Sequence, residues 1–411
     1  MHCQGRRKSG GTDYQRKTPR TTVGALLLPS LPEWMAAMLL FSIFVAGFSQ
    51  LLGGYFDLAA ILIILVIAFM RDRILEVSVS CLFVSAIAVA YGFIWIASCS
   101  PQTCSAEVVS TGTTVWQFGI YLLLFSIIAA HRMVWVSQKS VVIGFLAFFL
   151  FLSATNQASI FESLRGLNSS QFFNSYRFGI GNEVNNINFI ALFSASLTPF
   201  AFPKNSRDFS GYLATFLVLI VVVSTYSRGA LLVTGILAAL SGIVLWRGFR
   251  SKIFLFVFIL IGAGCLHWVG YFDKRSFDIG DASISARLRV FALLNDLELF
   301  GNKFALSSHF ARRGAIDNTL LRHLIGAGAG VSLLLFAFWS VFGAALKSWS
   351  LGGIRAREAL SLFGWSIALV LDDTFFSLWG AFLLGNFLPN IGNRRPTVNH
   401  VGRFSVNASA R

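Results

Sequence analysis

The stretch SGYLATFLVLIVVVSTYSRGALLVTGILAALSGIVLW, residues 210–246, decides the fold of this chain. It contains a single charged residue, Arg228, between two apolar runs. Each run approaches the roughly 20 apolar residues that a helix needs to cross a bilayer. The stretch therefore predicts two membrane-spanning helices joined by a short polar turn.

The composition of the whole chain agrees with this interpretation. Of 411 residues, 55% are hydrophobic and only 12% are charged, whereas a soluble domain carries roughly 25% charged residues. Ionised side chains are costly in hydrocarbon, so a lipid-facing surface explains the missing charge. The net charge of +15 could indicate nucleic acid, but no basic face with recognition elements is visible. We predict no nucleic-acid partner.

The predicted fold is all-α: a polytopic membrane helix bundle of about twelve transmembrane helices with a long periplasmic loop. Four of the apolar segments are short, which leaves a count of ten to twelve. Residues 1–33 are predicted as a basic cytoplasmic tail, 34–391 as the transmembrane domain and 392–411 as a second cytoplasmic tail. The predicted spans are 34–52, 55–70, 74–97, 115–131, 140–154, 187–203, 210–225, 229–246, 252–270, 319–346, 357–371 and 374–391.

The distribution of Lys and Arg orients this bundle, because cytoplasmic loops carry an excess of both. With a cytoplasmic N-terminus, 22 of the 33 basic residues fall in inside segments and three fall in short outside connections. Both termini are then predicted to be cytoplasmic. The other eight cations lie in 271–322, a long outside region of the kind that is largely exempt from this rule.

Two outside segments, 155–186 and 271–318, are longer than a connection requires. In the second, Val290, Leu293, Leu294 and Leu297 follow a helical stripe, which predicts an amphipathic helix on the outer membrane surface.

Cys99 and Cys104 share one short polar connection on the predicted outer side. Disulfides persist in oxidising compartments, so an extracytoplasmic position would allow these two residues to pair. The sequence leaves that pairing open.

The first candidate for chemistry is the turn before residue 229. Ser227 is a plausible N-cap of the following helix, and Arg228 would lie at the positive end of the helix dipole, where anions and phosphates are favoured. The alternative is an arginine that extends its side chain to the membrane interface.

Three further groups are candidates on the outer side. Arg177 could bind a phosphate and Asn185 could bind sugar hydroxyls, or both could belong to an ordinary polar turn. The pair Asp372–Asp373 could act as a base or bind a cation, although such a pair is more often a solvated turn.

The cations and histidines of the long region suggest either an anionic ligand or lipid headgroups, and His309 or His323 could be a general base. The polar residues of that region are Arg287, Arg289, His309, Arg312, Arg313, Asp317, Asn318, Arg322 and His323.

From about Tyr176 to Ala345 the chain resembles the O-antigen ligase and polymerase superfamily. Three features match in order: Arg177-Phe178-Gly179 followed by Asn185-Asn186; Ser227-Arg228-Gly229-Ala230; and Ser285-Ala286-Arg287-Leu288, then Gly301, then Asp317-Asn318-Thr319-Leu320-Leu321 with Gly328 and Gly330. The match covers roughly 40% of the chain.

The resemblance implies a GT-C-like glycosyltransferase of the bacterial inner membrane that is metal-independent and uses no cofactor. It would join saccharide units carried on undecaprenyl diphosphate at the periplasmic face. By this match Arg177, Arg228 and Arg287 would hold the diphosphate leaving group. Arg289, Asn318, Asn185 and Ser227 are the further candidates for substrate binding. The implied partners are the lipid-linked saccharide, membrane lipid, a chain-length regulator and a flippase.

One position departs from the family pattern, because ligases place a histidine where this chain has Asp317. Aspartate also accepts a proton, and some polymerases look similar there, so Asp317 is the candidate base. We therefore predict a polymerase that extends O-antigen or exopolysaccharide repeat units. The alternatives are an O-antigen ligase acting on lipid A core and, from another class, a transporter or flippase of lipid-linked or anionic solutes.

Overall fold

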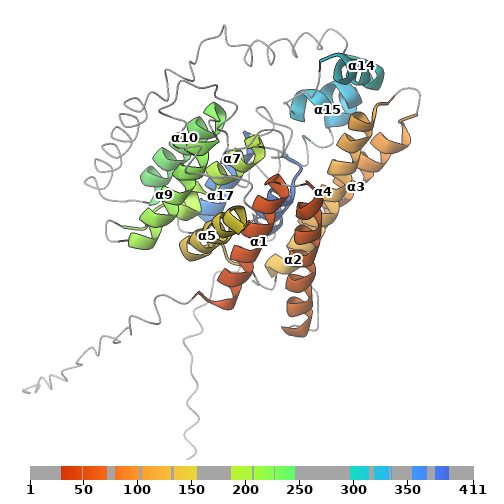
Figure 1. Ribbon diagram of the computed structural model, residues 1–411. Coiled ribbons are helices and arrows are strands. Elements are labelled where there is room, and N and C mark those ends of the chain that lie inside the picture. The colour runs from red at the N-terminus through yellow and green to blue at the C-terminus, as the bar shows by residue number, and fades with distance from the viewer. Residues whose placement is uncertain are drawn as a thin grey trace, which may run out of the picture.

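The computed structural model describes residues 29–48, 50–71, 79–100, 104–130, 134–154, 187–205, 208–225, 227–245, 297–313, 319–332, 335, 354–367 and 375–387. Within these ranges every regular element is a helix, as predicted (Figure 1). The helices are α1 (Leu31–Phe48), α2 (Gln50–Arg71), α3 (Val79–Ala97), α4 (Ala106–Ala130), α5 (Gln138–Ala154), α7 (Ile187–Ser196), α8 (Thr198–Ala201), α9 (Phe209–Ser224), α10 (Arg228–Leu245), α14 (Lys303–Arg313), α15 (Thr319–Ala327), the 3₁₀ turn η6 (Gly328–Gly330), α17 (Ile354–Ser366) and α19 (Leu378–Phe387).

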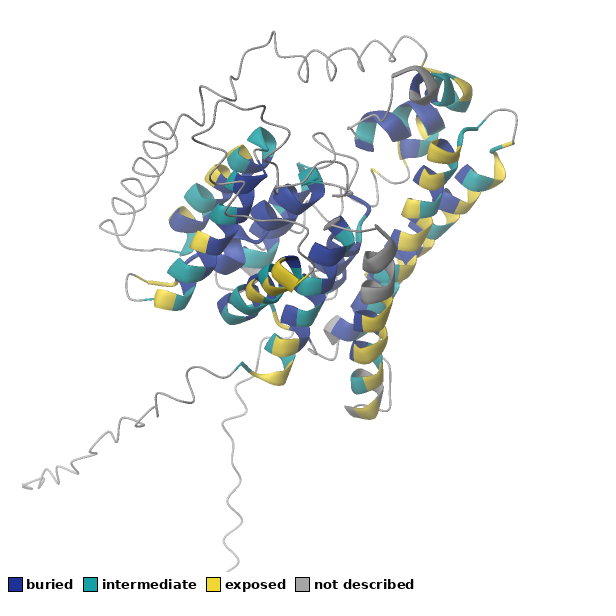
Figure 2. Cartoon of the chain, in the orientation of Figure 1, coloured by how far each residue is buried: buried dark blue, intermediate teal, exposed yellow. Residues whose placement is uncertain are grey.

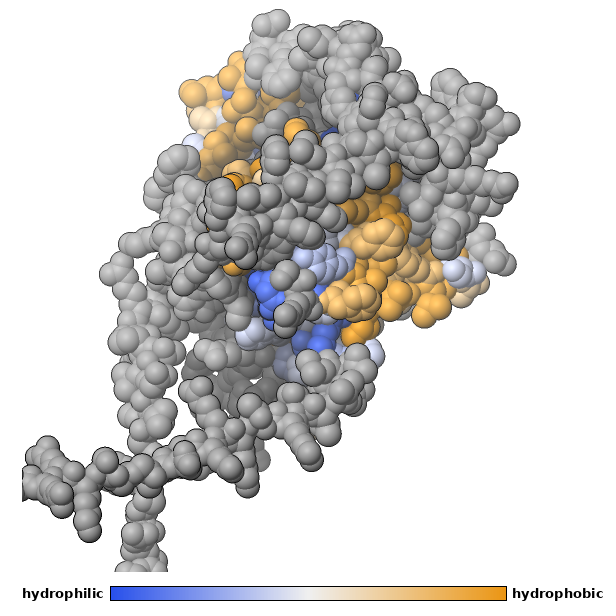
Figure 3. Space-filling model, turned by 90° about the vertical axis from the view of Figure 1, so that its left-hand side faces the viewer, coloured by the Kyte–Doolittle hydropathy of each residue, from blue (hydrophilic) through white to orange (hydrophobic). Residues whose placement is uncertain are grey.

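Three of the described helices are long and apolar enough to cross a membrane: Val79–Ala97, Ala106–Ile128 and Arg228–Leu245. Shorter apolar helices accompany them, among them Gln138–Ala154 and Phe209–Ser224. Large apolar side chains are exposed along these helices, for example Leu82 and Phe93 on α3 and Leu232 on α10. Exposed residues run along α3 in Figure 2, and Figure 3 shows apolar surface on the face that it presents. Water would disfavour such faces, whereas lipid would cover them. The fold is that of a membrane protein.

Two predicted spans are not continuous helices. The segment 187–203 divides into α7 and α8 at Leu197, because Pro199 stands at the start of α8 and has no N–H to continue the helix. The segment predicted from 319 onward begins with α15 but ends its first helix at Ala327, where η6 follows. The predicted span 252–270 lies outside the described residues.

The core is built from aromatic rings contributed by helices distant in sequence. Phe44 of α1 packs against Phe145 and Phe148 of α5 and against Phe193 of α7, with ring centroids 4.7 to 4.8 Å apart. Trp379 of α19 packs against Phe193 and donates its Nε1–H to Ser196 Oγ over 2.6 Å. Burial of such large rings supplies most of the packing energy.

The bundle has two ends with different contents. We call the end that holds residues 30–33, 135–138, 202–211 and 357 the lower end, and the end that holds residues 98–108 and 298–330 the upper end, as they lie in Figure 1. Phe202 at the lower end packs against Ala238 and Leu245 in the C-terminal half of α10. The N-terminus of α10, with Arg228, therefore lies at the upper end.

The lower end is closed by hydrogen bonds. Asp208 caps α9 and accepts from the backbone N–H of Lys204 and Gly211 and from the side chains of Gln138 and Ser210, over 2.7 to 3.1 Å. Burial alone would raise the pKa of the Asp208 carboxyl, but these four hydrogen bonds outweigh it and lower that pKa.

Arg357 of α17 lies beside this cluster. It donates to the carbonyl oxygens of Phe200 and Phe202, each over 3.2 Å. These carbonyls lie at the end of α8, where a helix leaves acceptors unsatisfied, so the guanidinium completes the hydrogen bonding of that terminus.

Candidate functional site

At the upper end, the ammonium group of Lys303 joins α14 to the end of α3. Its Nζ donates to the carbonyl oxygen of Trp95 over 2.8 Å and to Ser98 Oγ, and it lies 5.0 Å from the centroid of the Trp95 ring. That distance permits a cation–π attraction. Burial lowers the pKa of Lys303. The helix α14 was not predicted, because it lies within the segment 271–318 that we expected to be a loop.

Two glycines with positive φ place Lys303. Gly301 has φ 81° and Gly328 has φ 53°, a region that L-residues with a side chain rarely adopt. Asn302 N–H donates to Ile325 O over 2.7 Å and Ala329 N–H donates to Leu299 O over 2.8 Å. A Cβ at Gly328 would lie 2.3 Å from Glu298 O. The two backbones thus touch directly, in what we call the glycine joint (Gly301 and Gly328).

His323 of α15 is enclosed by aromatic side chains. Its Nδ1 lies 3.1 Å from Tyr91 Oη, and its ring centroid is 5.3 Å from that of Trp95 and 5.1 Å from that of Phe376. The imidazole is only 3% exposed. This enclosure favours a structural role over the predicted alternative of a general base. His309 of α14 is also buried.

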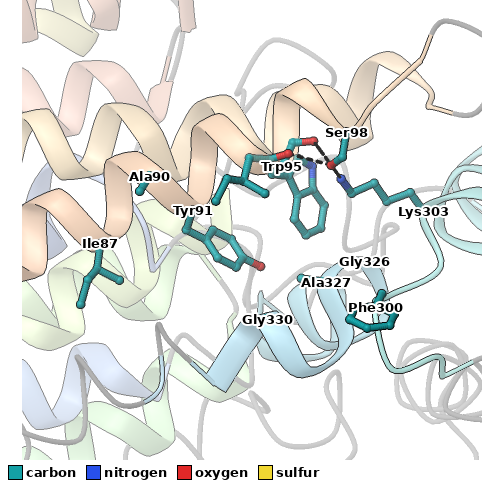
Figure 4. A pocket seen from close by; sticks show the side chains of 11 residues that line it. Ile87, Ala90, Tyr91, Trp95, Ser98, Phe300, Lys303, Gly326, Ala327 and Gly330 are labelled. Atoms are coloured by element: carbon teal, nitrogen blue, oxygen red, sulfur yellow. Dashed lines mark hydrogen bonds between the residues drawn. The ribbon is translucent and has the colours of Figure 1, made fainter.

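A pocket of about 320 Å³ lies between α3 and the segment that carries the glycine joint (Figure 4). Along α3 the lining residues follow one helical stripe from Ile87 through Tyr91 and Ile94 to Ser98. The opposite wall includes Phe300, Lys303, Gly326, Ala327 and Gly330. Polar atoms gather at the Ser98 end of the pocket, while the Ile87 end is apolar.

A disulfide joins Cys99 to Cys104 directly after α3, with a Cα–Cα distance of 5.5 Å. The sequence left this pairing open, and the structure forms it. The next residue, Ser105, donates its N–H to Ser307 Oγ of α14 over 2.9 Å. The disulfide-closed turn therefore holds α14 from the α4 side, as Lys303 does from the α3 side.

Ser227 and Arg228 begin α10 as predicted. Ser227 Oγ accepts from the N–H of Ala230 over 3.4 Å, the position of an N-cap bond to the third helical residue. Arg228 is the first residue of α10 and is half-buried. Its charge adds to the positive end of the α10 dipole.

Of the other candidates, Arg312 and Arg313 end α14 and Arg322 lies buried in α15. The rest lie outside the described residues: Arg177, Asn185, Arg287, Arg289, Asp317, Asn318 and the pair Asp372–Asp373. The amphipathic helix predicted around 290–297 also lies outside them, apart from Leu297, which is not helical. Among the predicted site residues, the structure thus describes Ser227 and Arg228 side by side.

Sequence reasoning missed Tyr91, Trp95, Ser98 and Lys303. The available signal was the position of Tyr91 and Trp95 near the outer end of a predicted span, where aromatic side chains are common.

Comparison of the sequence with protein-family models and with curated proteins gives no match. Within the described ranges, no group of three or more His, Cys, Asp or Glu residues could hold a metal ion.

Proposed function

We propose that this protein is a membrane glycosyltransferase that joins undecaprenyl-diphosphate-linked oligosaccharide units into O-antigen or exopolysaccharide at the periplasmic face of the bacterial inner membrane. The proposal includes a GT-C-like bundle of about twelve spans with both termini in the cytoplasm. It starts from the motifs at Arg177, Arg228 and Asp317.

The observation that carries the proposal is the position of Arg228. It stands at the N-terminus of an 18-residue apolar helix long enough to cross a membrane. A guanidinium at the positive end of a helix dipole suits an anion such as a diphosphate. Such an anion, attached to a lipid, would approach from the membrane around the bundle.

The disulfide supports the outer orientation of this end. Cys99 and Cys104 are paired at the upper end, and structural disulfides persist in oxidising compartments such as the periplasm. The distribution of Lys and Arg in the sequence supports the same orientation.

The proposed reaction breaks the bond between the anomeric carbon and the diphosphate oxygen. An acceptor hydroxyl attacks that carbon, the base Asp317 takes the hydroxyl proton, and the lipid diphosphate leaves with an additional negative charge. Cationic contacts that strengthen as this charge develops lower the barrier. Arg228, Arg177 and Arg287 are the proposed cations, and Arg289, Asn318, Asn185 and Ser227 the further substrate contacts.

The test is polymer formation by the full-length protein in membrane vesicles supplied with a lipid-diphosphate-linked oligosaccharide. Arg228→Ala should reduce the yield of chain-length ladders by about a hundredfold or more, with unchanged membrane insertion. The matched control is Lys204→Ala, which removes an exposed cation at the lower end and should give normal ladders. Normal ladders from Arg228→Ala would falsify the proposal.

Two further measurements define the reaction. Asp317→Asn should abolish ladders if Asp317 is the base, and unchanged yield removes it from the mechanism. Polysaccharide attached to lipid A core would identify a ligase instead, and movement of the lipid-linked substrate without a new glycosidic bond would identify a transporter.

A further inference from the structure

The pocket beside α3 has a gradient of polarity along the helix. Ser98 follows the last residue of α3, whereas Ile87 lies eleven residues earlier, about 16 Å along the axis. The hydrocarbon core of a bilayer is about 30 Å thick. If α3 spans the membrane, the pocket runs from the interface to about the middle of the bilayer, which is the depth of one leaflet.

The polar end of the pocket is built around the ammonium group of Lys303. Lys303 donates to Trp95 O and Ser98 Oγ, and both acceptors are neutral oxygens. An ammonium group has three N–H donors, and the described residues accept from two of them, so the third donor and the positive charge are available to a ligand. Ser98 is exposed beside it, and its hydroxyl already donates to Ile94 O and Trp95 O, over 2.7 and 2.9 Å, so Lys303 is the donor for a ligand. An anion of the size of a phosphate suits this end.

The apolar end and the rim of the pocket are continuous with a lipid-exposed surface. Ile94 is 63% exposed and Phe93 next to it is 65% exposed. On the opposite wall Phe300 is 88% exposed, the largest value among the apolar side chains near the pocket. In Figure 4 these walls face each other across the pocket, with Lys303 at the end near Ser98. An apolar chain can therefore enter sideways from the surrounding lipid.

We propose that this pocket binds one anionic glycerophospholipid of the leaflet at the upper end, with its phosphate on Lys303 beside Ser98 and an acyl chain along Ile87 and Ile94. The order of polarity along α3, anion-binding at the interface and apolar below it, is the order of groups in such a lipid. Charge complementarity selects an anionic headgroup over a zwitterionic one. The inference goes beyond the proposed function, and its test involves no transfer reaction.

The test is native mass spectrometry of the full-length protein in a non-ionic detergent, titrated with phosphatidylglycerol or phosphatidylcholine. The wild-type protein should retain one phosphatidylglycerol molecule about tenfold more tightly than phosphatidylcholine, because charge-assisted hydrogen bonds are stronger than neutral ones. Lys303→Gln keeps a donor for Trp95 O but removes the charge, and it should weaken phosphatidylglycerol binding by about tenfold.

A second variant tests the acyl-chain position. Ala90 lines the pocket and is exposed, so Ala90→Trp fills the pocket without disturbing the core and should remove the retained lipid. Matched controls are Phe83→Trp, on the lipid-exposed face of α3 outside the pocket, and Lys204→Gln at the lower end. Both should bind as the wild type does.

Three results would overturn the inference. The first is equal retention of the two lipids by the wild-type protein. The second is unchanged phosphatidylglycerol binding in Lys303→Gln. The third is unchanged binding in Ala90→Trp, which would show that the site takes an anion alone. Loss of binding in both pocket variants, with both controls intact, supports it.

Discussion

The charged side chains at the two ends of the bundle differ in their hydrogen-bond partners. At the lower end Asp208 accepts four hydrogen bonds, and Arg357 donates to two carbonyl oxygens at the end of α8. At the upper end Lys303 contacts only neutral oxygens and a ring among its described partners, and Arg228 stands at the positive end of a helix.

This difference separates charges that maintain the fold from charges that can meet a ligand. A buried ion with its hydrogen bonds completed inside the protein is destabilising to remove. A cation at a helix N-terminus instead makes the protein more attractive to anions while contributing little to folding. Replacing the charged residues of the lower end should therefore change stability, whereas replacing Arg228 or Lys303 at the upper end should change activity or binding.

The largest effects are expected when Arg357 and Arg228 are replaced by glutamine, each in a separate variant. Arg357→Gln should lower the free energy of unfolding by about 3 kcal/mol, because two hydrogen bonds from a charged donor are lost. Its activity per folded molecule should stay at the wild-type level. Arg228→Gln should show the reverse, with activity reduced about a hundredfold. Thermal unfolding in detergent and polymer yield measure the two quantities, and the same response from both variants would erase the contrast between the ends.

The next effect concerns the glycine joint. Gly328→Ala should lower the free energy of unfolding by about 2 to 3 kcal/mol, because the new Cβ meets Glu298 O at 2.3 Å in a positive-φ conformation. Gly330→Ala, two residues further on, is the matched control: among the described residues its Cβ would meet Ala327 Cβ alone, at 3.6 Å. The control should change stability by about 0.5 kcal/mol or less. Equal stability of the two variants would show that the joint is not a rigid contact.

A smaller effect is expected from Asp208→Asn, about 1 to 2 kcal/mol of stability, because an amide cannot accept from all four donors. The folded-state pKa of Asp208 is lowered below the unfolded value of about 3.9. Its stabilising contribution is therefore complete above that pH and is lost as the pH falls through the folded pKa. Unfolding measured from pH 6 to pH 3 should show a shallower acid dependence in the variant, and parallel curves would contradict the assignment.

The smallest effect is expected from Tyr91→Phe. The change removes the hydroxyl that meets His323 Nδ1 and should cost about 1 kcal/mol of stability. Phe93→Leu, on the exposed face of the same helix, should leave stability unchanged. A loss of polymer yield much greater than the loss of folded protein would mean that Tyr91 and His323 take part in the reaction, against the structural role favoured by their burial.

Properties set by local sequence were predictable, and contacts between distant segments were not. The helices of the bundle follow from apolar runs of bilayer length, and the Ser227 cap follows from a serine ahead of such a run. Pro199 also indicates the division at Leu197. We nevertheless predicted a single span over 187–203, because that segment is apolar throughout. Asp317 and Arg177 remain predictions.

The candidate pocket shows where local reasoning ends. Lys303 and Trp95 are 208 residues apart, and nothing in either neighbourhood points to the other. The helix α14 has a mixed sequence, KFALSSHFARR, that is short and mostly polar. It is held in place by tertiary contacts, namely burial of Leu306 and the bond from Ser105 to Ser307. Sequence periodicity does not contain that information.

The contact between Tyr91 and His323 also has a consequence for the order of assembly. The two residues are 232 positions apart in the chain. At about 5 to 20 residues per second, the ribosome needs roughly 10 to 50 s to reach His323 after it has added Tyr91. During that interval α3 and α4 are already made, while the segment that covers Tyr91 and Trp95 is not. The upper end therefore cannot close until residue 323 has been made, and a nascent chain stalled before that residue would present an open α3 to the membrane.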